Sequence, residues 1–122
     1  IHGWVEPKNI KFFYKNADAL LLPSWLEGFP NVIVESMASK VFVISTSVGN
    51  ISDAVIHNET GFLVEKKNSG DLFLKMKESI ENYQLRKTCS YNAYKYAEEN
   101  FSSSTASREI IRQINEATSK NK

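Results

Sequence analysis

Short apolar runs alternate with stretches of helical spacing along the first half of the chain. Three of these runs are continuously apolar or β-branched, as strands buried on both faces of a sheet usually are: 19–22, 41–46 and 62–64. The intervening segments have the periodicity or the capping residues of short helices: 7–16, 31–39 and 52–56, the last with Ser52 as its predicted cap. This alternation of strands and helices predicts an α/β domain with a parallel sheet.

From Ser69 onwards the chain has a helical pattern. One helix, over 71–82, carries an apolar residue at every fourth position, which predicts one apolar face built from Leu72, Met76 and Ile80. Two more helices are predicted to follow, over 84–100 and over about 102–118. Because the helices outnumber the strands, we expect a partial Rossmann-like sheet whose missing neighbours would precede residue 1.

The composition supports a single domain and argues against a nucleic-acid partner. With 122 residues, 42% of them hydrophobic, the chain is long enough for one core without a disulfide or a metal. The formal net charge is +1 and the basic residues are scattered, so we expect no nucleic-acid partner. The single cysteine, Cys89, cannot form an intramolecular disulfide, which favours a reducing compartment such as the cytoplasm. No apolar run reaches the roughly 20 residues of a membrane-spanning helix.

Two carboxylates, Glu27 and Glu35, lie on either side of a predicted helix start. In a strand–loop–helix unit both would lie at the carboxyl end of the sheet, where open α/β sheets bind ligands. Gly28 allows close backbone approach and unusual φ and ψ angles. The N–H groups of the helix start favour an anion such as a diphosphate, although Pro30 lacks one of them. The Glu35 carboxylate accepts two hydrogen bonds at once, which suits a vicinal diol such as that of a ribose.

A structural explanation of the same residues stays open at this point. A Glu near a helix start often complements the helix dipole or closes a capping box. With Asn31 as the cap, the box needs its Glu at the position before Glu35, so this explanation fits only loosely. Trp25 and Phe29 flank Glu27 and suit either the floor of a sugar site or an anchor for the loop. His2 and His57 are most simply solvated or packing residues.

Four motifs in order along residues 1–65 carry a resemblance to one enzyme family. Residues 22–38, L-P-S-W-L-E-G-F-P-N-V-I-V-E-S-M-A, resemble the E-x7-E signature of the retaining glycosyltransferases of family 4. Residues 43–46 resemble the strand that follows this signature in the family. Residues 48–53 resemble the family's G-G-x-P-E loop, and residues 58–64 resemble its N-G-x-x-G-F-L-V turn.

The resemblance implies the GT-B fold, in which two Rossmann-like domains face a cleft and the C-terminal one binds the nucleotide-sugar donor. Gly3-Trp4-Val5 resembles the stretch that precedes the signature in the family. We therefore expect this chain to be the later part of the C-terminal domain, truncated on its N-terminal side. The N-terminal domain, which binds most of the acceptor, would be a missing partner. In this fold the final helix crosses back to that domain, which predicts partial exposure of Ile110, Ile111 and Ile114.

The resemblance also implies roles for residues of the signature. Glu27 would contact the donor sugar as the catalytic residue, and Glu35 would hold the ribose hydroxyls. The sugar and the diphosphate would lie against the backbone of Gly28, Phe29, Pro30, Asn31 and Val32. The nucleobase would lie close to the backbone of Trp4 and Val5. The transfer would retain the configuration at the anomeric carbon and would need no metal or other cofactor. The family's commonest role, surface polysaccharide or glycolipid synthesis, implies a place in the cytoplasm or, by peripheral association, at the inner face of the membrane.

The chain departs from the family pattern at several positions. Asn50 stands where a second Gly is common, Ser52-Asp53 replaces Pro-Glu, and Pro30-Asn31 replaces the commoner Gly-Leu. The family's phosphate-binding Arg and Lys would lie before residue 1, so we expect the isolated chain to be catalytically inactive. Two alternatives remain: a nucleotide-binding module without turnover, and a nucleotide-sugar epimerase of the same fold.

Overall fold

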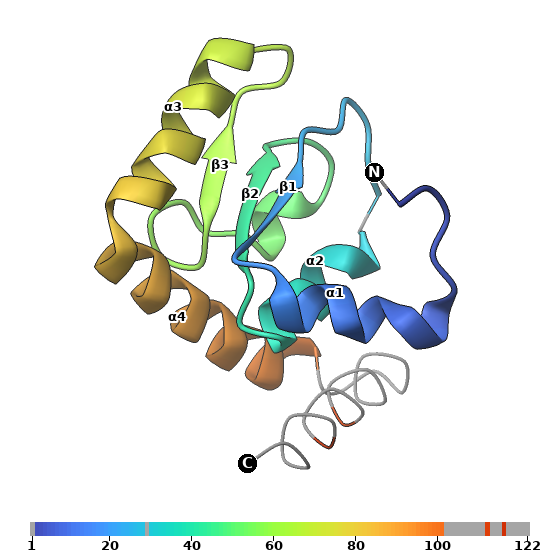
Figure 1. The fold of residues 1–122 in the computed structure, drawn as a ribbon. Helices are drawn as coiled ribbons and strands as arrows, with labels where there is room; N and C mark the ends of the chain where they lie inside the picture. The colour runs from blue at the N-terminus through green and yellow to red at the C-terminus, as the bar shows by residue number, and fades with distance from the viewer. Residues whose placement is uncertain (1, 29, 102–111, 113–115, 117–122) are drawn as a thin grey trace.

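The computed structural model describes residues 2–28, 30–101, 112 and 116. Its sheet has three strands in the order β1 (Ala19–Leu22), β2 (Phe42–Thr46) and β3 (Phe62–Val64). The strands point in the same direction in Figure 1, and both pairings are parallel. The predicted α/β fold with a parallel sheet is therefore confirmed, with each predicted strand end within one residue of the observed one.

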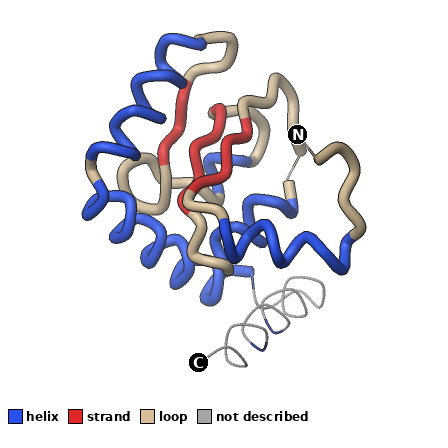
Figure 2. Tube along the Cα trace, viewed as in Figure 1, coloured by secondary structure: helices blue, strands red, loops and turns tan. Residues whose placement is uncertain are grey.

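Helices surround this sheet, as the blue segments of Figure 2 show. In chain order they are the 3-10 turn η1 (Pro7–Asn9), α1 (Ile10–Asn16), α2 (Asn31–Ala38), the 3-10 turn η2 (Ile51–Asp53), α3 (Ser69–Glu81) and α4 (Tyr83–Phe101). The connection between β1 and β2 contains α2, and the connection between β2 and β3 contains only η2. Among the described helices, none combines the length and the apolar character needed to cross a membrane.

The central strand β2 is buried along its whole length, and its alternating side chains belong to two separate cores. In the first core, Val43 packs with Ile33 and Met37 of α2 and with Ala93 and Ala97 of α4. The two alanines let the helix approach the sheet closely, since neither side chain extends beyond Cβ. One face of the sheet is thus covered by α2 and the second half of α4.

The second core lies on the opposite face of β2. Phe42 and Phe62 meet edge to face with their ring centroids 4.9 Å apart, and Cys89 of α4 packs beside them. Leu72 and Met76 cover this cluster from α3. Burial raises the pKa of the Cys89 thiol, which disfavours the reactive thiolate.

Two details of the predicted helices are wrong, the burial of Ile80 and the capping role of Ser52. Ile80 is 70% exposed, because two steps of four residues turn a side chain by about 80° around the helix axis. Ser52 does not cap a helix, since η2 begins at Ile51 and makes no side-chain capping bond. Helix α3 begins at Ser69, where the helical pattern was predicted to begin, and its start is capped by the Asn68 side chain, which accepts a hydrogen bond from the Asp71 N–H at 2.9 Å.

The predicted last helix, over about 102–118, lies outside the described residues except at 112 and 116, which are helical. The exposure predicted for Ile110, Ile111 and Ile114 also falls outside the described residues.

Replacing Phe62 by Ala is expected to lower the free energy of unfolding by about 3–5 kcal/mol, because it empties the centre of the second core. Urea denaturation followed by circular dichroism measures this loss. Phe73→Ala on α3 is the matched control, since that ring is 63% exposed and its removal should cost less than about 0.5 kcal/mol. Equal losses for the two variants would contradict the placement of Phe62 at the centre of a core.

Candidate functional site

The loops that follow the three parallel strands leave the sheet at the same edge, which is the edge predicted to bind a ligand (Figure 2). The loop after β1 carries Glu27 and leads into α2, which carries Glu35. The loop after β2 contains Gly49 and Asn50, and the loop after β3 contains Lys67.

Glu27 is held by a short series of hydrogen bonds that begins at the end of β2. The Thr46 hydroxyl donates to the Ser24 carbonyl oxygen at 2.6 Å, and the Ser24 hydroxyl donates to Oε1 of Glu27 at 2.9 Å. The Glu27 side chain is half-buried. Its other carboxylate oxygen, Oε2, accepts no hydrogen bond from the described residues. The protein thus orients the carboxylate, and within the described part of the chain Oε2 stays available to a ligand.

The loop after β2 packs directly against the backbone of Glu27. Gly49 has a φ of +54°, and a Cβ atom at this position would lie 1.9 Å from the Glu27 carbonyl oxygen. The next residue adds a hydrogen bond, from the Asn50 N–H to the Gly28 carbonyl oxygen at 3.3 Å. Only Gly tolerates both the positive φ and this close approach, so Gly49 fixes where Glu27 can lie.

The sequence prediction assigned this backbone freedom to the wrong glycine. Gly28 does not have a positive φ, and a Cβ atom there would have no heavy atom of the described residues within 4 Å apart from its own chain neighbours. Its surroundings are open, which leaves room for a ligand but does not require Gly. The signal for Gly49 was present in the resemblance of residues 48–53 to the family's G-G-x-P-E loop.

Glu35 lies in the second turn of α2 and is also half-buried. Its Oε2 accepts a hydrogen bond of 2.7 Å from the hydroxyl of Tyr14 on α1. Burial first, and the hydrogen bond and charge of Glu35 second, raise the pKa of Tyr14 well above its ordinary value. Tyr14 is therefore a neutral donor at physiological pH. The sequence prediction did not single it out, since its partner is 21 residues away along the chain.

The start of α2 offers free backbone donors between the two carboxylates. Pro30 precedes the helix and supplies no side-chain cap, and no acidic residue lies in the first turn. The first helical amides, of Asn31 and Val32, donate to no other described residue. Helix starts of this kind commonly bind anions, and the anion predicted at this position stays a prediction. Phe29 falls outside the described residues.

Trp4 and Val5 lie apart from these contacts. Trp4 is 81% exposed in the loop before η1. Among the described residues, no hydrogen bond or ring contact joins it or Val5 to Glu27 or Glu35. Their predicted place near a nucleobase stays a prediction.

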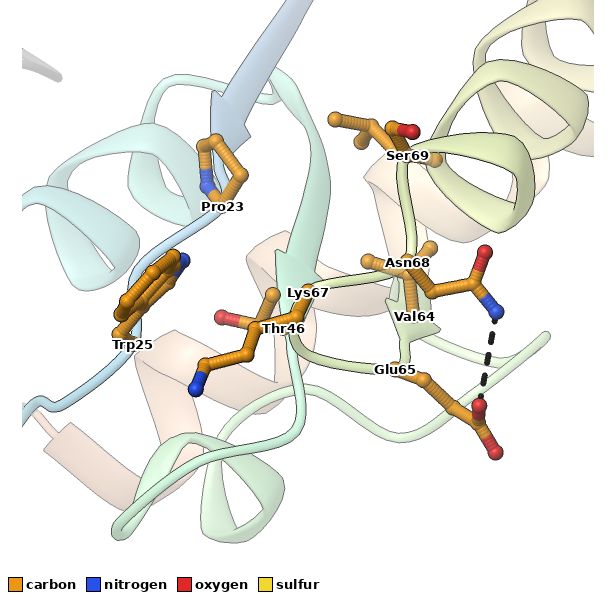
Figure 3. Close-up of a pocket in the computed structure, with 9 residues that line it drawn as sticks. Pro23, Trp25, Thr46, Val64, Glu65, Lys67, Asn68 and Ser69 are labelled. Carbon is orange, nitrogen blue, oxygen red and sulfur yellow. Dashed lines mark hydrogen bonds between the residues drawn. The ribbon is translucent and has the colours of Figure 1, made fainter.

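A cavity of about 320 Å³ lies beside Trp25, at the carboxyl ends of the strands (Figure 3). Thr46, Val64 and Leu72 form part of its wall. The Lys67 ammonium lies 4.5 Å from the centre of the Trp25 ring, and the two side chains point toward one another in Figure 3. Trp25 is 67% exposed, so it is not a buried anchor. Its ring lines a cavity on one side of the loop that carries Glu27.

Comparison with known proteins identifies the family. Residues 1–96 match the family model described as Glycosyl transferases group 1. The chain belongs to this family. Among its curated relatives, the capsular polysaccharide biosynthesis glycosyltransferase CapM of Staphylococcus aureus is 40% identical over 91 residues, which are 75% of this chain and 24% of CapM. The uncharacterized glycosyltransferase MJ1178 of Methanocaldococcus jannaschii is 41% identical over 85 residues, 70% of this chain and 24% of that protein. The chain thus spans about a quarter of the length of these relatives.

Two solved structures share the fold of this chain. The C-terminal domain of the group 1 family protein LpcC from Francisella tularensis superposes with a TM-score of 0.76 at 30% identity, over 83% of this chain and 52% of that one. Anabaena HepE, solved in complex with UDP, superposes with a TM-score of 0.72 at 28% identity, over 88% of this chain and 29% of that one. The expected fold, that of the C-terminal domain of a GT-B glycosyltransferase, is therefore confirmed.

Replacing Gly49 by Ala is expected to displace the loop that carries Glu27. The new methyl group would collide with the Glu27 carbonyl, and the positive φ would be strained, so the free energy of unfolding should fall by about 2 kcal/mol or more. Thermal unfolding measures the loss, and amide chemical shifts of residues 24–28 report the displacement.

The matched control for this change is Gly70→Ala. A Cβ atom on Gly70 meets only the Asn68 side-chain oxygen, at an ordinary distance of 3.5 Å. The free energy of unfolding of Gly70→Ala should be unchanged or slightly higher than that of the unmodified chain, and residues 24–28 should keep their amide chemical shifts. Unshifted amides at 24–28 in Gly49→Ala would argue against the contact between the two loops.

Proposed function

We propose that this group 1 glycosyl transferase chain is the donor-binding part of a retaining glycosyltransferase of family 4. It would bind a nucleotide-sugar whose sugar is transferred to an acceptor hydroxyl. The observation that carries the proposal is the placement of two half-buried carboxylates around the start of α2, each held by a hydroxyl donor. The likeness to HepE, a protein solved with UDP and with UDP-glucose, supports a nucleotide-sugar as the ligand.

Glu35 is proposed to bind the ribose of the donor. An ionised carboxylate only accepts hydrogen bonds, and its two oxygens match the two hydroxyls of a vicinal diol. Oε2 of Glu35 accepts one hydrogen bond, from the Tyr14 hydroxyl, while Oε1 accepts no hydrogen bond from any described residue. The acceptor capacity that remains is sufficient for a diol. The E-x7-E signature assigned from resemblance supports the same role.

Glu27 is proposed to contact the donor sugar, beside a diphosphate at the start of α2. The backbone N–H groups of Asn31 and Val32 would donate to the phosphate oxygens, together with the positive end of the helix dipole. Gly28, Phe29 and Pro30 complete the proposed binding segment. The carboxylate of Glu27 would stabilise positive charge that develops on the sugar as the diphosphate leaves, with retention at the anomeric carbon.

The wider setting of the reaction is part of the same proposal. The capsular polysaccharide role in the name of CapM supports surface polysaccharide synthesis as the pathway. The proposed partners are the nucleotide-sugar and an acceptor-binding N-terminal domain, in the cytoplasm or at the inner face of the membrane. A reaction without a metal stays a prediction.

Calorimetric titration of the 122-residue chain with UDP, GDP and ADP, and with UDP-glucose, tests donor binding. At least one of the nucleoside diphosphates should bind. Glu35→Ala should weaken that binding about tenfold or more, because hydrogen bonds to a charged group are lost. Glu59→Ala is the matched control, since Glu59 is exposed and outside the proposed site. If Glu35→Ala and the unmodified chain bind the nucleotide with equal affinity, the ribose role of Glu35 is wrong.

The isolated chain is expected to bind a donor without turning it over. Incubation with UDP-glucose and simple alcohol acceptors should release no UDP above the rate without protein, as followed by a coupled UDP assay. This expectation rests on the family resemblance, which implies that the Arg and Lys that would hold the diphosphate and stabilise the leaving group are not among residues 1–122. Release of UDP that depends on Glu27 would overturn it.

A further inference from the structure

Tyr14 is the one buried residue of α1. Its side chain is 8% exposed, and its hydroxyl reaches across to α2, where it donates to Oε2 of Glu35 at 2.7 Å. This hydrogen bond links the two helices directly at the Glu35 carboxylate. The contact therefore joins a segment that precedes the sheet to the carboxylate proposed to bind the ribose.

The chemistry of this pair differs from that of an ion pair. Glu35 makes no salt bridge within the described part of the chain. A Lys or Arg partner would cancel the charge of the carboxylate and compete with a ligand for both oxygens. A tyrosine hydroxyl occupies only one acceptor position and leaves the negative charge in place. The raised pKa of Tyr14 keeps its proton on the phenol, so the direction of the hydrogen bond is fixed.

A free glutamate side chain loses considerable rotamer freedom when it is fixed in one orientation. If that freedom is lost only when a ligand binds, affinity falls, whereas a side chain held beforehand binds more tightly. We propose that Tyr14 is a positioning residue that holds the Glu35 carboxylate ready to accept the ribose hydroxyls of the donor. This proposal rests on the proposed function, in which Glu35 is the ribose ligand.

The test measures how well the chain distinguishes a ribose from a deoxyribose. UDP, GDP and ADP, each paired with its 2′-deoxy counterpart, are titrated into the 122-residue chain and its variants by calorimetry. The unmodified chain should prefer the ribose form of the nucleotide that it binds, and Glu35→Ala should abolish that preference. Tyr14→Phe should weaken binding of the ribose form by about three- to tenfold and weaken the 2′-deoxy form by clearly less, since that form keeps only one of the two hydroxyls.

A purely structural role for Tyr14 would weaken both forms equally, so the ratio of the two affinities separates the two roles. Tyr94→Phe is the matched control, because it removes another tyrosine hydroxyl that donates to a glutamate, Glu98, at 3.3 Å on α4. The ratio should be unchanged in this variant.

The double variant Tyr14→Phe/Glu35→Ala keeps the proposal testable if Tyr14→Phe is too unstable to titrate. Because both partners become apolar, neither is left as an unpaired polar group. If Tyr14 acts only through Glu35, the double variant should bind the nucleotide as Glu35→Ala does. A further loss would overturn the positioning role.

The outcomes distinguish this proposal from the function on which it rests. If Glu35→Ala abolishes the preference for ribose and Tyr14→Phe leaves it intact, the role of Tyr14 is overturned and the ribose role of Glu35 stands. If the unmodified chain shows no preference for any ribose form, the ribose role of Glu35 fails, and the role of Tyr14 fails with it.

Discussion

The burial of β2 on both faces is the constraint on which the rest of the structure depends. Phe42 and Ile44 point into one core and Val43 into the other, so helices must cover both sides of the sheet. The same strand ends in Ser45 and Thr46, whose hydroxyls donate to the carbonyl oxygens of Leu22 and Ser24. The buried strand that organises the core therefore also fixes the start of the loop that carries Glu27.

The site is built by backbone packing as much as by side chains. Gly49 lets the loop after β2 lie against the Glu27 peptide, and the Asn50 N–H closes the contact at Gly28. Each of the two carboxylates is then oriented by a neutral hydroxyl, Ser24 for Glu27 and Tyr14 for Glu35. Neutral donors orient a carboxylate without cancelling the charge that a ligand would use. Because the chain belongs to the group 1 glycosyl transferase family, the proposed function of this arrangement is to bind a nucleotide-sugar.

Much of the fold followed from local pattern. The continuous apolar runs at 19–22 and 62–64 are strands with the predicted bounds, and the alternation of elements predicted a parallel sheet. Ile80 was misplaced, because a spacing of four departs from the helical repeat over two steps. Ser52 was misplaced as a cap because side-chain capping depends on where a short turn begins, and the sequence leaves that uncertain by a residue or two.

The sequence by itself determined the order of strands and helices and membership of the group 1 glycosyl transferases, and it drew attention to the carboxylates Glu27 and Glu35. These are properties of short segments, since apolar runs, helical spacing and motifs are each read within a few residues. Only the tertiary structure decided that Gly49 rather than Gly28 has the positive φ, and that Tyr14 is bonded to Glu35. The physical reason is the same in both cases. Each contact joins residues some 20 positions apart, and its energy exists only once the sheet has brought their segments together.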